Sequence, residues 1–443
     1  MTPERLFLAG LSAYGRGERE VPARYCERAL REGAPTEALT VRLAHLYLVS
    51  TDLWWSAATP SPRVGEFVDR AMGAAARAGD AESQALADCV YGQYLLVTTG
   101  LPAAVEVFAR ARELADRSGS VLAELEALAD LGHHSIGLDL NRGRGLLREA
   151  LALARRAIRV PAADLPLVRV QRARIPGLIG VASYDAGRFG EAEPALRQSL
   201  DGLAAVHAWD QHAMISNFLA QLLTETGRFA EAEDTLLEAL AALQAHADLS
   251  THQGYNLGLL GKCYLDWGRI DAAEAAITGG WKRLTATRHQ AILPILRNYL
   301  GELTMHPANP HRDLARAREL FDETVTECQR TGFQRSEIGA LSLLALADLA
   351  AGRVPDALDA CGRAFDRLAA TGTLPALRSE EVYLTRYKVL RAAGAAEAGG
   401  WLDRARQTLL DKAATLPTRT LRDQFLAGTP VSRDIVAAGT GAT

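Results

Sequence analysis

The sequence predicts an all-α solenoid built from about ten helical hairpins. A glycine-containing turn recurs every 40–44 residues. A pair of small residues twelve positions apart accompanies most of these turns. The segments between turns have apolar residues at helical spacing, as at Leu236, Leu240 and Leu243, and little β-branched alternation. These observations predict helices along the chain and no β-sheet.

The turn motif is most regular in the middle of the chain, where Gly187, Gly227 and Gly268 are 40 and 41 residues apart. Arginine and an apolar residue follow each of these glycines, and an alanine-rich acidic stretch comes next. Gly100 lies 87 residues before Gly187, and Gly352 lies 84 residues after Gly268. Each of these distances corresponds to two repeats. The other glycines in the series are Gly17, Gly100, Gly352 and Gly394.

Small residues provide a second register. One stands seven or eight positions before the turn glycine, and another follows twelve positions later. Two helices that cross closely need a small residue on each of them, because a larger side chain would hold the axes apart. The pairs are Gly92 and Ala104, Gly180 and Ala192, Ala220 and Ala232, Gly261 and Ala273, and Ala345 and Ala357.

This pattern resembles the tetratricopeptide repeat (TPR), whose two helices carry small residues at motif positions 8 and 20. The resemblance covers nearly the whole chain and is closest over 170–280. The repeat here is longer than the standard 34 residues. It is similar to the long-repeat subclass of kinesin light chains and of sensor regions in bacterial transcriptional activators and signalling ATPases. The resemblance implies a right-handed superhelical solenoid whose first helices line a concave channel.

The array is expected over residues 1–428. Thr2 and Pro3 predict the N-cap and first residue of the opening helix. The period is interrupted near 50–64 and near 304–312, where longer loops are expected. Residues 416–426 resemble the last helix of bacterial sensor regions, which implies a C-terminal helix that caps the final repeat. Residues 429–443 are rich in glycine, alanine and threonine, and a flexible tail is expected there.

Composition excludes several classes of function. A net charge of −4 over 443 residues gives no basic surface for direct nucleic-acid binding. The five cysteines lie far apart without a CxxC motif, which argues against a disulfide framework and a structural zinc site. The N-terminus lacks a secretory pattern, and no apolar run approaches the roughly 20 residues that span a bilayer. We therefore expect a cytoplasmic protein that does not contact membranes.

Polar residues recur just after the first small residue of several repeats, a position that faces the channel in the resembling family. Asparagines occupy equivalent places one turn earlier in two repeats. We expect these side chains to bind a partner in the concave channel. The alternative is a solvated helix face, because polar residues on an open face need no function. The predicted partner-binding residues are His45, Gln93, His133, Asn217, Gln221, Lys262, Asn298 and Glu302.

Histidines recur in three successive loops between repeats. Histidine and aspartate are suitable zinc ligands, but nothing in the spacing brings them within bonding distance of one ion. We therefore expect solvated loop histidines, no metal site and no cofactor. The residues concerned are His207, His212, His246, His252 and His289.

No nucleophile triad, paired-carboxylate motif, HExxH or phosphate loop appears, so no catalytic residue is assigned and an enzyme is not the expected class. The sequence predicts a scaffold, adaptor or regulatory sensor region that docks a protein or peptide in its channel. The alternative is a small-molecule receptor or atypical enzyme with a site in the lumen. A closed pocket would favour that alternative, and an open groove the scaffold. The oligomeric state is left open, a homo-oligomer included.

Overall fold

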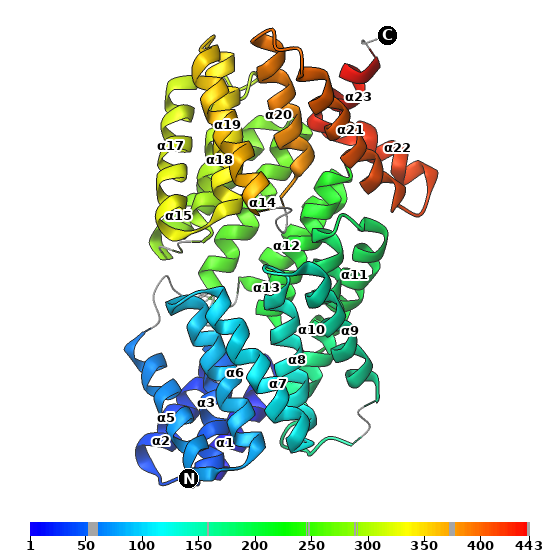
Figure 1. Cartoon of the computed structure of the whole chain (residues 1–443). Coiled ribbons are helices and arrows are strands. Elements are labelled where there is room, and N and C mark those ends of the chain that lie inside the picture. Colours follow the sequence, from blue (N-terminus) through cyan, green and yellow to red (C-terminus); the bar gives the residue numbers. More distant parts are fainter. Residues whose placement is uncertain are drawn as a thin grey trace. The chain divides into compact units, whose positions relative to one another are not determined.

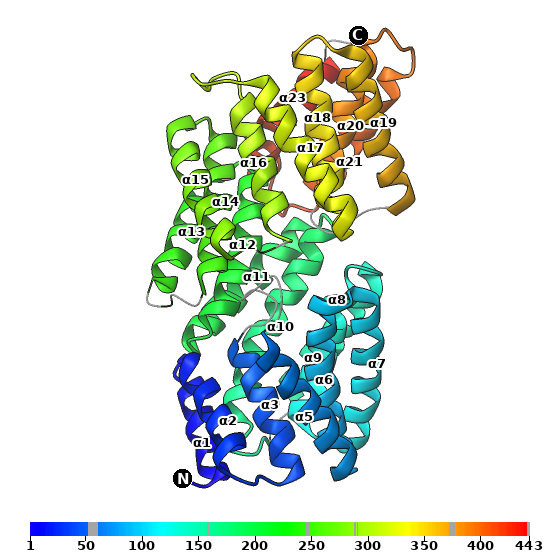
Figure 2. The same cartoon turned by 90° about the vertical axis from the view of Figure 1, so that its left-hand side faces the viewer.

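The structure is a computed structural model that describes residues 1–51, 61–156, 159–244, 246, 249–287, 289, 291–371 and 377–440. Within these ranges the chain forms 22 helices and no strand, which confirms the predicted all-α class (Figures 1 and 2). The described helices divide into two compact units, although a single continuous array is expected from the sequence. The division passes through three helices, so that each of these contributes residues to both units.

Unit 1 contains Met1–Ala182 and Pro194–Ile215. Its first helix begins as the sequence predicts, because the main-chain N–H of Arg5 donates to Thr2 Oγ1 and Pro3 occupies the first helical position. The helices that lie wholly in unit 1 are α1 (Pro3–Tyr14), α2 (Glu20–Glu32), α3 (Glu37–Thr51), α5 (Pro62–Ala78), α6 (Ala81–Thr98), α7 (Leu101–Ser118), α8 (Val121–Ser135) and α9 (Leu140–Arg156). The helices shared with unit 2 are α10 (Leu165–Asp185), α11 (Phe189–Ala205) and α12 (Trp209–Glu225).

Unit 2 contains Ser183–Glu193 and Ser216–Thr443. The short stretch 183–193 belongs to it because the C-terminal helices pack on those residues, as described below. The helices that lie wholly in unit 2 are α13 (Phe229–Leu243), α14 (Ser250–Trp267), α15 (Ile270–Thr287), α16 (Leu293–Met305), α17 (Leu314–Thr331), α18 (Gln334–Ala350), α19 (Val354–Thr371), α20 (Ser379–Ala392), α21 (Ala398–Ala414), α22 (Arg419–Gly428) and α23 (Pro430–Thr440).

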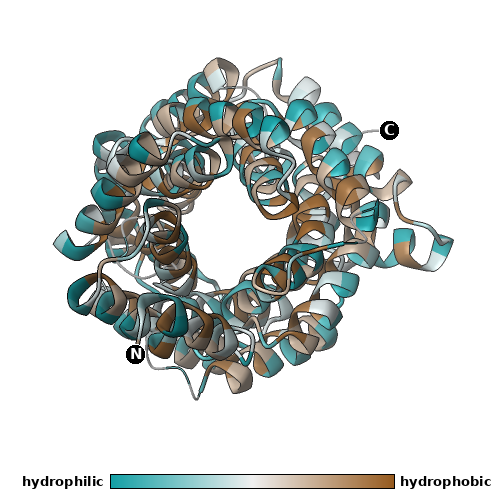
Figure 3. Cartoon of the chain, turned by 90° about the horizontal axis from the view of Figure 1, so that it is seen from below, coloured by the Kyte–Doolittle hydropathy of each residue, from teal (hydrophilic) through white to brown (hydrophobic). Residues whose placement is uncertain are grey.

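Helical hairpins are the building blocks of both units. Consecutive helices such as α6 and α7, or α14 and α15, make the most extensive contacts, and alternate helices such as α14 and α16 also pack together. Coloured by hydropathy, the helices carry hydrophobic residues on part of their surface and hydrophilic residues on the rest (Figure 3). This is the packing of a solenoid, in which each hairpin buries its apolar faces against its neighbours.

The small residues lie where the sequence predicts, at the helix crossings. The alanines of the five pairs are all buried, with at most 1% of their surface exposed. Gly261 on α14 shows the constraint most clearly, because an added Cβ would lie 2.4 Å from Ile277 Cγ1 and 2.9 Å from the Ile277 main-chain nitrogen on α15. The seven turn glycines all have positive φ, a conformation that side chains disfavour.

The C-terminal residues correct one expectation. A flexible tail is expected from residue 429, but Pro430–Thr440 forms α23, which packs on α20, α21 and α22. Thr429 Oγ1 accepts the main-chain N–H of Ser432 at 3.1 Å, and Ile435 is completely buried. Thr429 and Pro430 thus give the same helix-start signal as Thr2 and Pro3. The glycine and alanine content of residues 429–443 indicated a flexible tail instead. Residues 441–443 lie outside the described residues.

Helix α22 packs on α21, near the position expected for a cap, but also reaches the beginning of unit 2. The rings of Phe425 on α22 and Phe189 on α11 meet edge to face, with centroids 5.7 Å apart. Of the two interruptions expected from the sequence, residues 306–313 between α16 and α17 are not helical. At the other, Ser50 and Thr51 end α3 and Pro62 begins α5, while residues 52–60 lie outside the described residues.

The crossing of α14 and α15 gives a test of the packing. We expect Gly261→Ala to lower the free energy of unfolding by about 1–3 kcal/mol, because the added methyl group meets backbone that cannot move aside easily. Gly279→Ala on α15 is the matched control, since its Cβ would meet only Leu257 Cδ1 at 3.7 Å. That substitution should raise stability by roughly 0.5–1 kcal/mol through helix propensity. Urea unfolding followed by circular dichroism measures both, and equal stability of the two variants would contradict the close crossing.

Candidate binding site

A cavity of about 330 Å³ lies within unit 2. Its wall comes chiefly from the first helices of successive hairpins, α12, α14, α16, α18 and α20, and Pro430 and Val431 of α23 also contribute. The helix order explains this arrangement, because alternate helices of a solenoid face the same side. Leucine, isoleucine and methionine side chains share the wall with charged and amide groups.

Four of the eight predicted partner-binding residues line this cavity, namely Gln221, Lys262, Asn298 and Glu302. Asn217, one turn before Gln221 on α12, is 1% exposed, and its main-chain carbonyl accepts the Gln221 Nε2 amide at 3.1 Å. Four of the five predicted residues of unit 2 therefore share one cavity wall, and the fifth, Asn217, is buried beside it. Their role in binding a partner stays a prediction.

Lys262 on α14 is held between two carboxylates. Its Nζ donates to Asp266 Oδ1 at 2.9 Å, one turn along the same helix, and to Glu302 Oε1 of α16 at 2.7 Å. Burial alone would lower the pKa of Lys262, but Asp266 and Glu302 raise it above its ordinary value. Burial raises the pKa of Glu302, and Lys262 only partly offsets the effect. Lys262 is therefore a firmly charged ammonium, whereas the charge on Glu302 is disfavoured.

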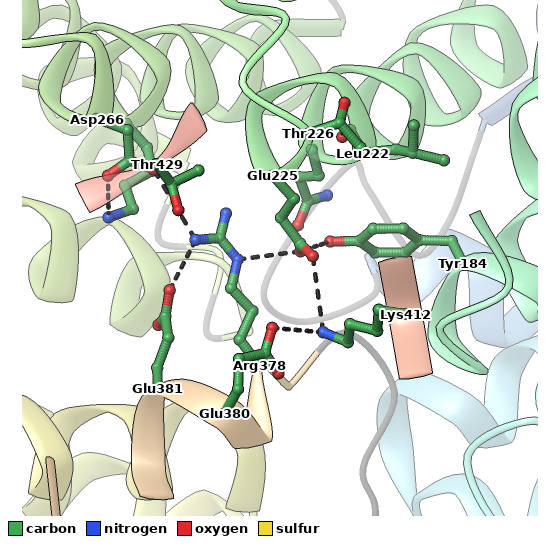
Figure 4. Close-up of polar contacts among 12 residues, drawn as sticks. Tyr184, Leu222, Glu225, Thr226, Asp266, Arg378, Glu380, Glu381, Lys412 and Thr429 are labelled. Carbon is green, nitrogen blue, oxygen red and sulfur yellow. Dashed lines mark hydrogen bonds and ion pairs between the residues drawn. The ribbon is translucent and has the colours of Figure 1, made fainter. Parts of the chain in front are cut away.

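Arg378, which directly precedes α20, links this pair to the rest of the network (Figure 4). Its Nη1 donates to Glu381 Oε1 at 2.7 Å and lies 3.8 Å from Asp266 Oδ2, while its Nε lies 3.0 Å from Glu225 Oε1. Burial alone would lower the pKa of Arg378, but Glu225, Glu381 and Asp266 raise it. One guanidinium thus connects α12, α14 and α20.

Lys412 of α21 extends the network to the C-terminal helices. Its Nζ donates to Glu380 Oε1 at 2.7 Å and lies 3.8 Å from Glu225 Oε2. The Tyr184 hydroxyl donates to the same Glu225 carboxylate (Figure 4). Burial alone would raise the pKa of Glu225, but Arg378 and Lys412 lower it below its ordinary value. Glu225 is therefore the anion at which the two ends of unit 2 meet.

Main-chain contacts close unit 2 at the same place. The Phe189 N–H donates to Thr415 Oγ1 at 3.1 Å, and Gln424 Nε2 donates to the Gly227 carbonyl at 3.4 Å. A Cβ on Gly227 would lie 2.5 Å from Gly428 Cα. Residues about 200 positions apart in sequence are thereby joined, and the helices of unit 2 close on themselves.

The other three predicted residues, His45, Gln93 and His133, lie in unit 1. His45 Nε2 lies 3.5 Å from Glu126 Oε1, and Gln93 Nε2 donates to Asp130 Oδ2 at 2.9 Å, so both residues pair with carboxylates of α8. Burial lowers the pKa of His133 well below its ordinary value, helped by the neighbouring His134 and Arg174, and its ring is neutral at physiological pH. His45 is buried, Gln93 and His133 are half-buried, and none of the three lines the unit 2 cavity.

Of the five predicted loop histidines, His207 is exposed as expected, His212 and His246 are half-buried, and His252 and His289 are buried. His252 lies in the first turn of α14 and is 1% exposed, and His289 is 4% exposed. His212 lies within α12, and burial lowers its pKa. His207 occupies the turn between α11 and α12 with a φ of 57°. His212 and His252 are helical because α12 and α14 begin earlier than the expected loop boundaries, whereas His207, His246 and His289 lie outside the helices.

Across the described ranges, no three His, Cys, Asp or Glu side chains are arranged to hold a metal ion. None of the helices in those ranges combines the length and the apolar character needed to cross a bilayer.

Sequence reasoning missed Asp266, Glu225, Arg378 and Lys412. A signal existed for Asp266, which stands four residues after Lys262 and so shares its helix face. Arg378 and Lys412 carry no such signal, because they meet Glu225 only through the closure of unit 2.

The TPR family model matches residues 171–245, which contain the most regular hairpins of the chain. This part of the chain contains tetratricopeptide repeats. The resemblance to the tetratricopeptide repeat that the small-residue pairs predict is thereby confirmed. No curated protein sequence matches the chain significantly.

Three solved structures illustrate the fold. NprR in complex with its cognate peptide NprX has a TM-score of 0.54 and 14% identity, covering 84% of this chain and 99% of NprR. The Rap conjugation gene regulator of plasmid pLS20, in complex with the Phr* peptide, has a TM-score of 0.52 and 11% identity, covering 84% and 96%. A signal transduction ATPase with numerous domains and a TPR sensor, from Pyrococcus horikoshii, has a TM-score of 0.51 and 15% identity, covering 90% of this chain and 56% of that one. At these identities the similarity establishes the fold alone.

The two glutamates of the network should respond differently to loss of charge. We expect Glu225→Gln to lower the free energy of unfolding by about 3 kcal/mol at neutral pH, because it leaves Arg378 and Lys412 without their shared buried partner. The pKa of Glu225 is lowered by folding, so its contribution is present above the ordinary value of 4.5 and is lost as the pH falls. The difference between wild type and variant should therefore shrink below pH 4.5.

Glu302→Gln is the matched comparison. Folding raises the pKa of Glu302, so its charge is already disfavoured at neutral pH and its removal should cost less. Urea unfolding of both variants across the pH range gives the measurement. Equal losses at neutral pH, or a Glu225→Gln effect that persists in acid, would contradict this description of the network.

Proposed function

We propose that the protein is a scaffold that binds a peptide or a segment of a partner protein, and that the cavity of unit 2 receives part of that segment. The observation that carries the proposal is the cavity itself, whose wall is built from the first helices of successive repeats. Its lining combines apolar side chains with amides and charged groups. Such a wall suits a bound peptide, which has both apolar side chains and a polar main chain.

Amide side chains provide a specific means of recognising a peptide backbone. Gln221 and Asn298 both line the cavity, and each carboxamide can donate and accept a hydrogen bond. A peptide group also has one donor and one acceptor, so an amide side chain can satisfy both at once. The cavity volume is near the lower end of the range of about 300–1,000 Å³ for ligand pockets, which fits a terminus or an anchoring side chain and not a long segment.

Proteins of similar fold support this class of function. NprR and the pLS20 Rap regulator are each named as complexes with a peptide. We extend the proposal to an adaptor or sensor region of a bacterial regulator that works in the cytoplasm, in line with the similarity to the TPR sensor of the Pyrococcus horikoshii protein.

The closure of unit 2 favours a second candidate, a receptor for a small molecule. Closed pockets are typical of small-molecule sites, and the contacts of Thr415 with Phe189 and of Gln424 with Gly227 join the two ends of this unit. In this second candidate the same cavity would hold the whole ligand. An atypical enzyme is not favoured, because the cavity's charged groups are engaged with one another in ion pairs.

Selection from a displayed library of short peptides tests the scaffold proposal. We expect enriched peptides to bind the wild type, and the triple variant Gln221→Ala, Lys262→Ala, Glu302→Ala to lose at least about tenfold in affinity, since each substitution removes a polar group from the cavity wall. Isothermal titration calorimetry measures the affinities, and circular dichroism checks that helicity is retained.

The matched control replaces three exposed residues of the same types in unit 2, as Gln407→Ala, Lys282→Ala and Glu319→Ala. This control should bind like the wild type. Enriched peptides that bind both triple variants equally would place the peptide site elsewhere. The absence of any enriched peptide would favour the small-molecule receptor.

A further inference from the structure

The buried network around the cavity contains more carboxylates than cations. The continuous chain of ion pairs joins five carboxyl groups to three cations, which leaves a surplus of two negative charges, or of one when Glu302 is protonated, the form that its raised pKa favours. Uncompensated charge is costly to bury, so such a surplus calls for a further positive group. The carboxylates are Glu225, Asp266, Glu302, Glu380 and Glu381, and the cations are Lys262, Arg378 and Lys412.

The surplus lies at the cavity end of the network. Glu225 is stabilised as an anion by Arg378 and Lys412, whereas burial, Asp266 and Glu381 all raise the pKa of Glu302. Asp266, Glu302 and Glu381 line the cavity.

The other basic residues of the wall do not compensate this charge. Lys388 pairs with Asp434 at 2.6 Å. Burial alone would lower the pKa of Arg335, and Asp185, which is not one of the five carboxylates, is among the groups that raise it. Burial lowers the pKa of His306, so its imidazole is neutral at physiological pH.

An independent observation comes from Asn298 on α16. This side chain is 7% exposed, and its Nδ2 donates to the Ser336 carbonyl at 3.2 Å, which orients the amide. Its Oδ1 is buried and accepts no hydrogen bond from the described residues, although Asn298 lines the cavity. Asp266 Oδ2 likewise accepts none, and the Asp266 side chain is 10% exposed. The unsatisfied atoms at this wall are therefore acceptors, which a hydrogen-bond donor would complete.

We infer that the cavity of unit 2 binds a protonated primary amine carried on an apolar body. The ammonium group supplies both the missing positive charge and a donor for Asn298, which lies one turn before Glu302 on α16. Leu259, Ile295 and Leu343 line the same space and suit a hydrocarbon portion. A metal ion fits less well, because no three metal-ligating side chains converge within the described part of the chain.

This inference rests on the proposed function and names its ligand chemistry. Two sources share that chemistry: the free N-terminus of a peptide and a small organic amine. The probes separate them. The small-molecule probes are a cation, 2-phenylethylamine, its neutral isostere, 2-phenylethanol, and an anion, 3-phenylpropanoate. The peptide probe is leucyl-phenylalanine amide, which is compared with its N-acetylated form.

Calorimetric titration of the whole chain gives the dissociation constants. We expect 2-phenylethylamine to bind at least about tenfold more tightly than 2-phenylethanol, as charge-assisted hydrogen bonds are stronger than neutral ones. The carboxylate probe should not bind. A free N-terminus should show the same advantage over an acetylated one if peptides are the source.

Two variants give opposite expectations. Glu302→Gln should weaken amine binding about tenfold, and Asn298→Asp should strengthen it, because the first removes a carboxylate and the second adds one. Asn298→Asp also loses the bond to the Ser336 carbonyl, so its stability should fall while its amine affinity rises. A purely structural role for Asn298 would lower both. Glu319→Gln, on the exposed side of α17, is the matched control and should bind like the wild type.

The outcomes distinguish this inference from the proposed function. Equal binding of amine and alcohol, tighter binding of the carboxylate, or no binding of any amine at millimolar concentration would overturn the inference. Library peptides that bind equally with free and acetylated N-termini, together with no preference for the amine probe over the alcohol, would overturn it and leave the scaffold function standing. Amine binding without any selected peptide would uphold it and replace the scaffold by a small-molecule receptor.

Discussion

Each hairpin of the array depends on the close approach of two helix backbones at a pair of small residues. Gly261 and Ala273 allow α14 and α15 to meet where even one added methyl group would contact the opposing backbone. This crossing sets the rotation of the first helix about its axis. The rotation in turn directs Lys262, the next residue, towards the inner wall of unit 2. A packing constraint thereby determines which polar side chains share the cavity.

The sequence could predict this much because the signal is local and repeated. Turn glycines, small-residue pairs and apolar spacing recur with a near-constant period, and each hairpin needs them independently of the others. Gln221, Lys262 and Glu302 follow from the same register, since equivalent positions of successive repeats face the same side. The helix after residue 429 was also predictable, because Thr429 and Pro430 give a standard start signal.

The closure of unit 2 has no such signal. Phe425 meets Phe189, and Lys412 meets Glu225, across separations that no repeat length encodes. Each of these residues alone is an ordinary apolar or charged side chain on a helix. Only the accumulated rotation of successive hairpins brings them together, and a small error in each crossing would separate them. The prediction of solvated histidines is wrong for His252 and His289 for a related reason, because their burial depends on packing beyond their own turns.

Arg378 connects the closure of unit 2 with its cavity. The same guanidinium approaches Glu225 at the closure and Glu381 and Asp266 at the cavity wall. A ligand that competes for the cavity carboxylates changes how strongly Arg378 is held on that side. Thermodynamic linkage is reciprocal. The free energy by which a bound ligand changes the contact between Arg378 and Glu225 equals the free energy by which that contact changes the binding of the ligand. The buried network is therefore poorly explained as a source of stability, for which apolar packing would serve as well. Its observed role is to join the two ends of unit 2, through Glu225, to the carboxylates of the cavity wall.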